Sequence, residues 1–122
     1  APTRLPQAGG PLSVQLHEPA RQPDARYRNA VVVAPAGLDR SPCGTGTSAR
    51  LANLHARGQL GVGDAFGHES IIGTLFTGRI AALTDVAGTP AVVPEITGRA
   101  WMTGQGTLCL DPSDPFPGGF LL

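Results

Sequence analysis

Residues 38–58, LDRSPCGTGTSARLANLHARG, place one of the two cysteines directly before a Gly- and Thr-rich run that leads into a helical pattern. The first turn of a helix has amide N–H groups without intrahelical partners, and the aligned peptide dipoles put partial positive charge there. Gly44 and Gly46 allow the backbone to approach a ligand closely. The helix can be capped by a hydroxyl from Thr45, Thr47 or Ser48. We therefore expect this stretch to bind an anion, such as a carboxylate or a phosphate.

The thiol of Cys43 is the group in this stretch that can do chemistry. The field at a helix start favours thiolate over thiol, so we expect a reactive sulfur. Asp39, four residues earlier, opposes that effect unless its carboxylate is engaged elsewhere, for example by a substrate ammonium. An acceptor for a cationic nitrogen, donors for a carboxylate and a thiol between them together outline an α-amino acid with its Cα near the sulfur.

Other interpretations of the same residues are weaker. A Walker-type phosphate loop requires a Lys before its Ser or Thr, and this chain has no Lys. A nucleophilic Cys–His pair could use one of the three histidines, but no local signature supports it. A metal site is not expected, because the two Cys and three His show no ligand spacing. From local physics alone, a buried structural Cys beside a tight turn stays open. The three histidines are His17, His55 and His68.

Composition narrows the class of protein. A length of 122 residues is one domain's worth of chain, and 41% hydrophobic and 15% charged residues with a net charge of zero indicate a globular protein that does not bind nucleic acid. The longest apolar run, Ala30 to Ala34, is far shorter than the roughly 20 residues that span a bilayer. No stretch resembles a signal peptide, so we expect a cytoplasmic protein with free thiols and no membrane association.

The pattern of apolar residues predicts strands on both sides of a helix. SVQLHE at 13–18 alternates apolar and polar residues, as a half-buried strand does, and NAVVVA at 29–34 is typical of a buried strand. After Gly58 come short segments rich in β-branched residues and separated by Gly or Pro, which predict antiparallel strands. These segments are GHESIIGT (67–74), LFTGRIAAL (75–83), PAVVPEITG (90–98) and AWMTGQGTLCL (100–110).

The one predicted helix runs from about Ser48 to Arg57 and is apolar on most of its circumference. Such a helix belongs in the middle of a fold, and Gly58 is expected to cap it in a left-handed conformation. The predicted fold class is α+β, a mainly antiparallel sheet wrapped around a central apolar helix. Residues 1–12 are expected to be an irregular lead-in that looks cut from a longer chain. The Pro-rich tail is not expected to be regular, although its two phenylalanines could pack onto a neighbour.

A family resemblance sharpens these expectations. DRSPCGTGTSA resembles the second-cysteine motif of the proline racemase family, which includes 4-hydroxyproline 2-epimerases. RNAVVVAPAGLDRSPCGTGTSARLANLHARGQL, HESIIGT, FTGR, AVVPEITGRAWMTG and LDPSDPFPGGF resemble the C-terminal half of that family in order. The resemblance implies that 13–122 is the C-terminal lobe of a two-lobed enzyme with a diaminopimelate-epimerase-like fold, and that the N-terminal lobe is absent.

The same resemblance implies a racemase or epimerase that works with two cysteines and no cofactor. One thiolate removes the α-proton and the other thiol delivers a proton to the opposite face. Cys43 is then one of the two acid/base groups, Gly44 and Thr45 donate their amides to the substrate carboxylate, and Asp39 contacts the ring nitrogen. The resemblance implies that the family's dehydratase branch has Thr at the position of Cys43, so the presence of Cys43 disfavours that branch.

Substrate choice and completeness are the remaining expectations. The resemblance also implies that proline racemases have a bulky Phe at the position of Val33. Val33, which leaves space, and Ser13, which can hydrogen-bond a ring hydroxyl, therefore favour hydroxyproline, with proline as the alternative. The first-lobe cysteine, normally in an MCGH-like motif, is missing, and Cys109 stands where the family motif asks for no Cys. A different class of function is then a catalytically inactive lobe that only binds anions. Such a lobe is expected to self-associate, for example as a homodimer, through a surface that the N-terminal lobe normally covers.

Overall fold

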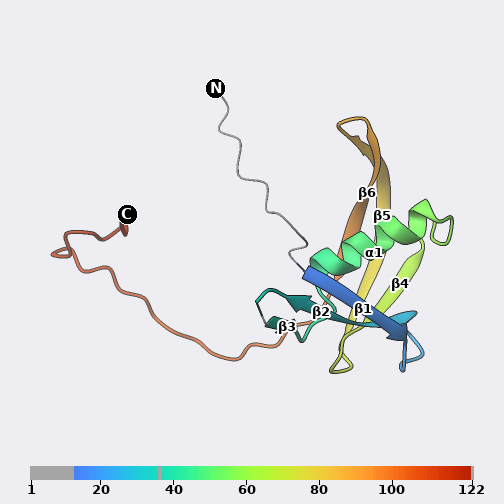
Figure 1. The fold of residues 1–122 in the computed structure, drawn as a ribbon. Helices are drawn as coiled ribbons and strands as arrows, with labels where there is room; N and C mark the ends of the chain where they lie inside the picture. Colours follow the sequence, from blue (N-terminus) through green and yellow to red (C-terminus); the bar gives the residue numbers. More distant parts are fainter. Residues whose placement is uncertain (1–12, 36, 122) are drawn as a thin grey trace.

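The computed structural model describes residues 13–35 and 37–121 (Figure 1). The predicted lead-in at 1–12 lies outside the described residues. Six strands and one helix follow in the order β1 (Ser13–Pro19), β2 (Tyr27–Val33), β3 (Gly37–Asp39), α1 (Gly44–Ala56), β4 (Ala65–Glu69), β5 (Leu75–Val86) and β6 (Thr89–Thr97). Within the described ranges, no helix is long and apolar enough to cross a membrane.

The strands form one sheet in the order β1-β2-β4-β5-β6, with β3 paired to β2. All neighbouring strands are antiparallel except β2 and β4, which are parallel. A parallel pair needs a long crossover connection, and α1 supplies it between β3 and β4. The mixed α+β class and the mainly antiparallel sheet are therefore confirmed.

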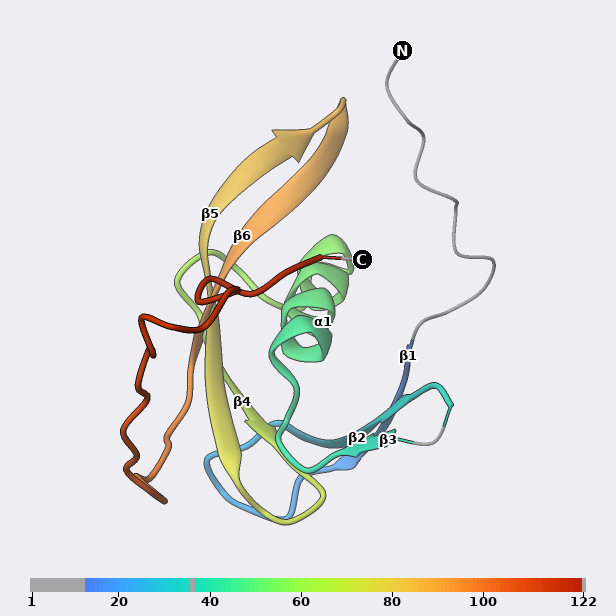
Figure 2. The same cartoon turned by 90° about the vertical axis from the view of Figure 1, so that its left-hand side faces the viewer.

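The helix lies against one face of a bent sheet (Figure 2). The strands β4 to β6 run along one side of α1, while β1 to β3 lie beneath its first turn. Three buried residues, Thr47, Leu51 and Leu54, follow helical spacing and form a single stripe. They face a core whose buried apolar members are Val31, Leu51, Leu54, Leu60, Phe66 and Ile80. Asn53 and Ala56 are exposed, so the structure does not confirm a helix enclosed by the sheet.

Both ends of α1 are set by specific hydrogen bonds. The helix begins at Gly44, four residues before the predicted start, because the side chain of Cys43 rather than a hydroxyl caps it. At the other end Gly58 adopts φ 69°, and its N–H donates to His55 O at 2.9 Å. The N–H of Gln59 donates to Leu54 O at 2.8 Å, which completes a Schellman motif. The predicted left-handed cap at Gly58 is confirmed.

The first strand is present where predicted, but its apolar side faces outward. Val14 and Leu16 are 50% and 60% exposed, whereas Gln15 between them is partly buried toward α1. Alternation along a strand shows that one face is apolar; it does not show on which face the helix packs. In this chain the polar face of β1 lies beneath the helix start.

The predicted strand at 100–110 is wrong. Residues 98–110 have no regular secondary structure and are exposed throughout, including Trp101, Met102, Leu108 and Leu110. A strand forms only when a neighbour pairs with its backbone, and β6 ends the sheet at Thr97 without a further partner in the described residues. Farther along, the rings of Phe116 and Phe120 pack against each other with centroids 5.5 Å apart.

Candidate active site

Cys43 lies between β3 and α1 with φ 64° and ψ 118°. A residue with a β-carbon rarely adopts a positive φ, and such a conformation costs on the order of 1–3 kcal/mol. The surrounding structure must therefore hold it. A glycine would take this conformation without cost but would carry no thiol.

Three hydrogen bonds, each from a backbone N–H to a side chain, shape the segment before the helix and its first turn. Asp39 Oδ1 accepts from the Ser41 N–H at 2.8 Å, and Ser41 Oγ accepts from the Cys43 N–H at 3.0 Å. Cys43 Sγ in turn accepts from the Gly46 N–H at 3.3 Å. Each bond spans two or three residues, so the carboxylate of Asp39 and the thiol of Cys43 are fixed within one compact turn.

The start of α1 offers free donors beside the sulfur. The N–H groups of Gly44 and Thr45 lie in the first turn, where a helix provides no carbonyl partner. Both residues are exposed, while Cys43 and Asp39 are half-buried. A β-carbon on Gly44 would meet no atom within 4 Å, so the space in front of this turn is open. The structure therefore brings Asp39, Cys43, Gly44 and Thr45 together in one segment.

Gln15 is a neighbour of this turn that the sequence analysis missed. A β-carbon on Gly46 would lie 2.7 Å from Gln15 Nε2 and 3.3 Å from Val31 Cγ2, so Gly46 is the residue that lets α1 sit on β1 and β2. The side-chain amide nitrogen of Gln15 is buried and has no hydrogen-bond partner among the described residues. Strand alternation could have placed Gln15 opposite Val14, but only the packing shows that α1 covers that side.

Ser13 and Val33, the two residues expected to influence substrate choice, are direct cross-strand partners of β1 and β2. Directly opposed residues in an antiparallel pair have β-carbons about 4.5–5.5 Å apart, so these two side chains are neighbours. Both residues are exposed, and the exposed fraction of Val33 is 43%. In the same register Val31 pairs with Asp39, which places Ser13 and Val33 at the end of the sheet that also carries β3.

A buried polar network lies behind Cys43. Asn29 Nδ2 donates to the carbonyl of Pro42 at 2.8 Å, and Thr47 Oγ1 lies 3.2 Å from the same oxygen. Thr47 Oγ1 is also 2.9 Å from His68 Nδ1. Asn29, Thr47 and His68 are 3%, 0% and 0% exposed. These contacts join β2, α1 and β4 around the peptide that precedes the thiol.

The histidines do not act on the thiol directly. Burial lowers the pKa of His68 to about 4, with the positive charges of His17 and Arg50 as smaller causes. Burial, and then Arg50, also lowers the pKa of His17, whose ring stacks on His68 with centroids 5.9 Å apart. His55 Nδ1 is bonded to Leu60 O at 2.9 Å. Within the described residues none of them is hydrogen-bonded to Cys43, so a Cys–His nucleophilic pair has no support.

Cys109 is separate from this arrangement. Both cysteines are free thiols, but Cys109 is exposed in the irregular segment after β6. No hydrogen bond in the described structure ties that segment to α1 or to the turn that holds Cys43.

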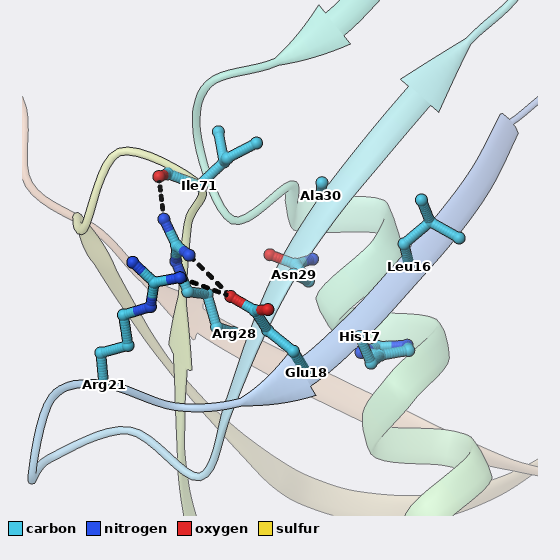
Figure 3. A pocket seen from close by; sticks show the side chains of 8 residues that line it. All are labelled: Leu16, His17, Glu18, Arg21, Arg28, Asn29, Ala30 and Ile71. Carbon is cyan, nitrogen blue, oxygen red and sulfur yellow. Dashed lines mark hydrogen bonds and ion pairs between the residues drawn. The ribbon is translucent and has the colours of Figure 1, made fainter.

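A hollow of about 300 Å³ lies at the end of β1 and the start of β2 (Figure 3). Its two arginines share one carboxylate: Arg28 Nη1 lies 2.6 Å from Glu18 Oε1, and Arg21 Nη2 lies 3.5 Å from the same oxygen. Arg28 also donates to the carbonyl of Ile71. Arg28 Nε also lies 3.7 Å from Glu69 Oε1, so both arginines already have carboxylate partners within the described residues, which favours a structural role for the hollow. It is lined by Leu16, His17, Glu18, Arg21, Arg28, Asn29, Ala30 and Ile71, without Cys43.

A thiol at a helix start, flanked by a carboxylate and by amide N–H groups that have no partner among the described residues, is an arrangement suited to proton transfer at an amino or imino acid. The sequence matches the family described as proline racemase over residues 3–121. The chain belongs to the proline racemase family.

Several named proteins are similar to this chain. A 4-hydroxyproline 2-epimerase from Streptosporangium roseum is 60% identical over 100 residues, which cover 81% of this chain and 30% of that protein. A proline racemase from Clostridioides difficile is 50% identical over 109 residues, covering 89% of this chain and 32% of the relative.

A solved structure is similar as well. The crystal structure of a hydroxyproline epimerase from Agrobacterium vitis with bound trans-4-hydroxy-L-proline superposes with a TM-score of 0.72 and 47% sequence identity. The match covers 93% of this chain and 32% of that chain. The chain therefore spans about a third of the length of the relatives it matches.

Proposed function

We propose that this chain forms the C-terminal part of a cofactor-independent racemase or epimerase that acts on a cyclic imino acid, with 4-hydroxyproline as the favoured substrate. The observation that carries the proposal is the position of Cys43 Sγ at the start of α1, with the Gly46 N–H directed at it from 3.3 Å. The N–H groups of Gly44 and Thr45 and the carboxylate of Asp39 belong to the same turn.

Substrate binding follows from the charges of that turn. The carboxylate of the imino acid accepts hydrogen bonds from Gly44 and Thr45, where the helix dipole also favours negative charge. Asp39 Oδ1 already accepts from Ser41, which leaves Oδ2 to accept from the protonated ring nitrogen. With both ends of the amino-acid group held, Cα lies beside the sulfur of Cys43.

The proton transfer needs two groups on opposite faces of Cα. In one direction a thiolate takes the α-proton, and the electron pair of the broken C–H bond is delocalised into the substrate carboxylate. A thiol on the other face then gives its proton to Cα, which inverts the configuration. The amides of Gly44 and Thr45 stabilise the charge that grows on the carboxylate. Cys43 acts as thiol in one direction and as thiolate in the other.

The second thiol comes from outside these 122 residues in this proposal. The chain covers about a third of its relatives' length, which leaves room for a second lobe of a diaminopimelate-epimerase-like fold. Cys109 does not fill the role, because it is exposed in the segment after β6.

Hydroxyproline is favoured over proline by the pair formed by Ser13 and Val33. Ser13 can hydrogen-bond a ring hydroxyl, and the small Val33 beside it leaves space for that hydroxyl. Proline is the alternative substrate, since a proline racemase is among the relatives that are 50% identical.

A second candidate function is a catalytically inactive lobe that binds anions at the start of α1. It is favoured by the short length of the chain relative to its relatives and by the single thiol in the helix-start turn. This lobe is predicted to form homodimers. A cytoplasmic location also stays a prediction.

Deuterium wash-in tests the proposal. The longest natural polypeptide that contains this chain is incubated in D₂O with trans-4-hydroxy-L-proline or with L-proline, and deuterium at Cα is measured. We expect exchange with hydroxyproline, slower exchange with proline, and none in the Cys43→Ser variant. Absence of exchange with both substrates would overturn the proposal. The 122-residue chain alone is expected to be inactive, and exchange at an ordinary rate by that chain would contradict the need for a second lobe.

A further inference from the structure

The peptide between Pro42 and Cys43 is held more tightly than a helix cap requires. Its carbonyl oxygen accepts hydrogen bonds from two side chains, Asn29 Nδ2 at 2.8 Å and Thr47 Oγ1 at 3.2 Å. Its N–H donates to Ser41 Oγ at 3.0 Å. Both polar groups of this peptide are thus fixed from several sides, and the orientation of the peptide sets the φ of Cys43.

The direction of the bond from Asn29 is determined by its partner. A carbonyl oxygen can only accept, so the amide NH₂ of Asn29 must face Pro42 and its Oδ1 must point elsewhere. That Oδ1 is buried without a hydrogen-bond partner in the described part of the chain. A buried amide with one unsatisfied end is unfavourable, so Asn29 is a costly choice for packing alone. The hydrogen bond from Asn29 Nδ2 to the Pro42 carbonyl is therefore the feature of Asn29 that matters for the site.

The bond between Thr47 and His68 has a direction as well. Thr47 has one hydroxyl proton, and donating it to the Pro42 carbonyl leaves Oγ1 as the acceptor for His68. His68 must then carry its proton on Nδ1, and Nε2 is a bare acceptor. Nε2 is indeed buried without a partner among the described residues. A proton on that nitrogen would have no acceptor, which agrees with the lowered pKa of His68.

The network acts at a point where the backbone is unfavourable. Cys43 has φ 64°, a value that it would leave if the preceding peptide were free to rotate. Rotation of that peptide would also turn the Cα–Cβ bond and carry Sγ away from the Gly46 N–H. Asn29 on β2 and His68 on β4 are far from Cys43 in sequence, so they tie the thiol to the rigid sheet.

We propose that Asn29, Thr47 and His68 are positioning residues, which hold the Pro42–Cys43 peptide so that the thiol faces the substrate site at the start of α1. The inference rests on the proposed function for its catalytic consequence. Within the described residues, none of the three side chains is hydrogen-bonded to the sulfur, and none binds the substrate in the proposed arrangement. Their role is to keep the sulfur of Cys43 within the narrow range of positions from which proton transfer to Cα is fast.

The test compares Thr47→Val with Thr47→Ser. Valine keeps the shape of threonine but removes the hydroxyl; serine keeps the hydroxyl and loses the methyl. The same change at an exposed threonine, Thr84→Val, is the matched control. Two quantities are measured at fixed pH: the rate of iodoacetate alkylation of Cys43 relative to that of Cys109 in the same molecule, and kcat and KM for deuterium exchange in the longest natural polypeptide.

We expect Thr47→Val to change the Cys43 to Cys109 alkylation ratio several-fold and to lower kcat by about tenfold or more with little change in KM, because the substrate contacts remain. Thr47→Ser is expected to keep the alkylation ratio and kcat close to those of wild type, and Thr84→Val to change neither quantity. Asn29→Leu removes the other donor and serves as a second variant if Thr47→Val does not fold, as judged by circular dichroism.

The outcomes separate this inference from the proposed function. If wild type shows no exchange but the alkylation ratio of Thr47→Val differs from that of wild type, the positioning network is supported and the proposed enzyme is contradicted. Wild-type exchange together with unchanged alkylation and kcat in folded Thr47→Val overturns the positioning role. A loss of kcat that Thr47→Ser does not restore also overturns it, because the hydroxyl would then not be the group that matters.

Discussion

The backbone N–H of Gly46 donates a hydrogen bond to Sγ of Cys43 over 3.3 Å, so the thiol is the cap of the helix it precedes. Helix caps are usually oxygen acceptors, because Ser, Thr, Asp and Asn bind the first free N–H groups more strongly than sulfur does. A cysteine here gives up part of that stabilisation. In return, the Gly46 N–H is directed at a group that can exchange a proton.

This trade-off predicts that Cys43→Ser separates stability from activity. Serine is a better cap, so we expect the free energy of unfolding to stay equal or to rise by up to about 1 kcal/mol. Deuterium exchange is expected to disappear, because a hydroxyl is a far weaker acid than a thiol. Denaturant unfolding and the exchange assay check the two parts. Cys109→Ser, at an exposed position, is the control and should alter neither. A marked loss of stability in Cys43→Ser would contradict the capping role.

The packing of α1 onto β5 gives a second prediction, at Gly78. A β-carbon there would lie 3.0 Å from Leu51 Cδ1, 3.3 Å from Ile96 Cδ1 and 3.4 Å from Thr47 Cγ2. Gly78→Ala should gain up to about 1 kcal/mol from lower chain entropy in the unfolded state, but overpacking costs about 1–3 kcal/mol. We expect net destabilisation, measured by denaturant unfolding.

Gly104→Ala is the matched control for Gly78→Ala, because a β-carbon at Gly104 would meet nothing within 4 Å. Its free energy of unfolding should stay within about 0.5 kcal/mol of wild type. Since Thr47 is one of the displaced neighbours, Gly78→Ala is also expected to disturb Cys43. Equal stability of the two variants would show that the helix can move away from the sheet without cost.

The elements that could be predicted from the sequence are those whose signals are local. Alternation and β-branched residues between turn residues located β1, β2, β5 and β6, and Gly58 located the end of α1. The start of α1 was placed too late, because Gly and Thr are poor helix formers and a cysteine is not a usual cap. The segment at 100–110 has the composition of a strand, but strand formation depends on a partner that composition does not reveal.

The same distinction applies to the site. Asp39, Cys43, Gly44 and Thr45 lie in seven consecutive residues, 39–45, so their proximity is a property of the local chain. Gln15, Asn29 and His68 reach this region from three different strands, and their positions depend on register and on which face of the sheet α1 covers. Polar residues in strands carry no sign of such a role, since most of them face solvent.

The lowered pKa of His68 predicts a pH-dependent stability. In the unfolded chain the pKa is near 6.5, and in the folded protein burial lowers it to about 4. Between these values the unfolded state binds a proton that the folded state does not, so stability rises with pH in this window and falls as the pH drops. The contribution of this group is at most about 1.4 kcal/mol per pH unit. His17, whose pKa is also lowered, acts in the same direction.

His68→Asn isolates this effect. Asparagine can place a polar atom where Nδ1 of His68 meets Thr47 Oγ1, and it does not titrate. We expect the free energy of unfolding of wild type to fall more steeply than that of His68→Asn between pH 6.5 and 4, with parallel curves above pH 7. Denaturant unfolding at a series of pH values gives both curves. Parallel curves over the whole range would mean that His68 is protonated as easily in the folded protein as in the unfolded one.

The pairing of Ser13 with Val33 leads to a prediction about substrate choice. Phenylalanine at position 33 would fill the space beside Ser13 that the ring hydroxyl of hydroxyproline occupies in our proposal. In the longest natural polypeptide, Val33→Phe is expected to lower kcat/KM for trans-4-hydroxy-L-proline by about tenfold or more relative to L-proline, since pocket contacts of this size discriminate by about 1–3 kcal/mol. Val32→Phe is the control, because Val32 points to the opposite face of β2. Val32→Phe should leave the ratio of the two kcat/KM values as it is in wild type. If the ratio of Val33→Phe also equals that of wild type, Val33 is not a specificity determinant.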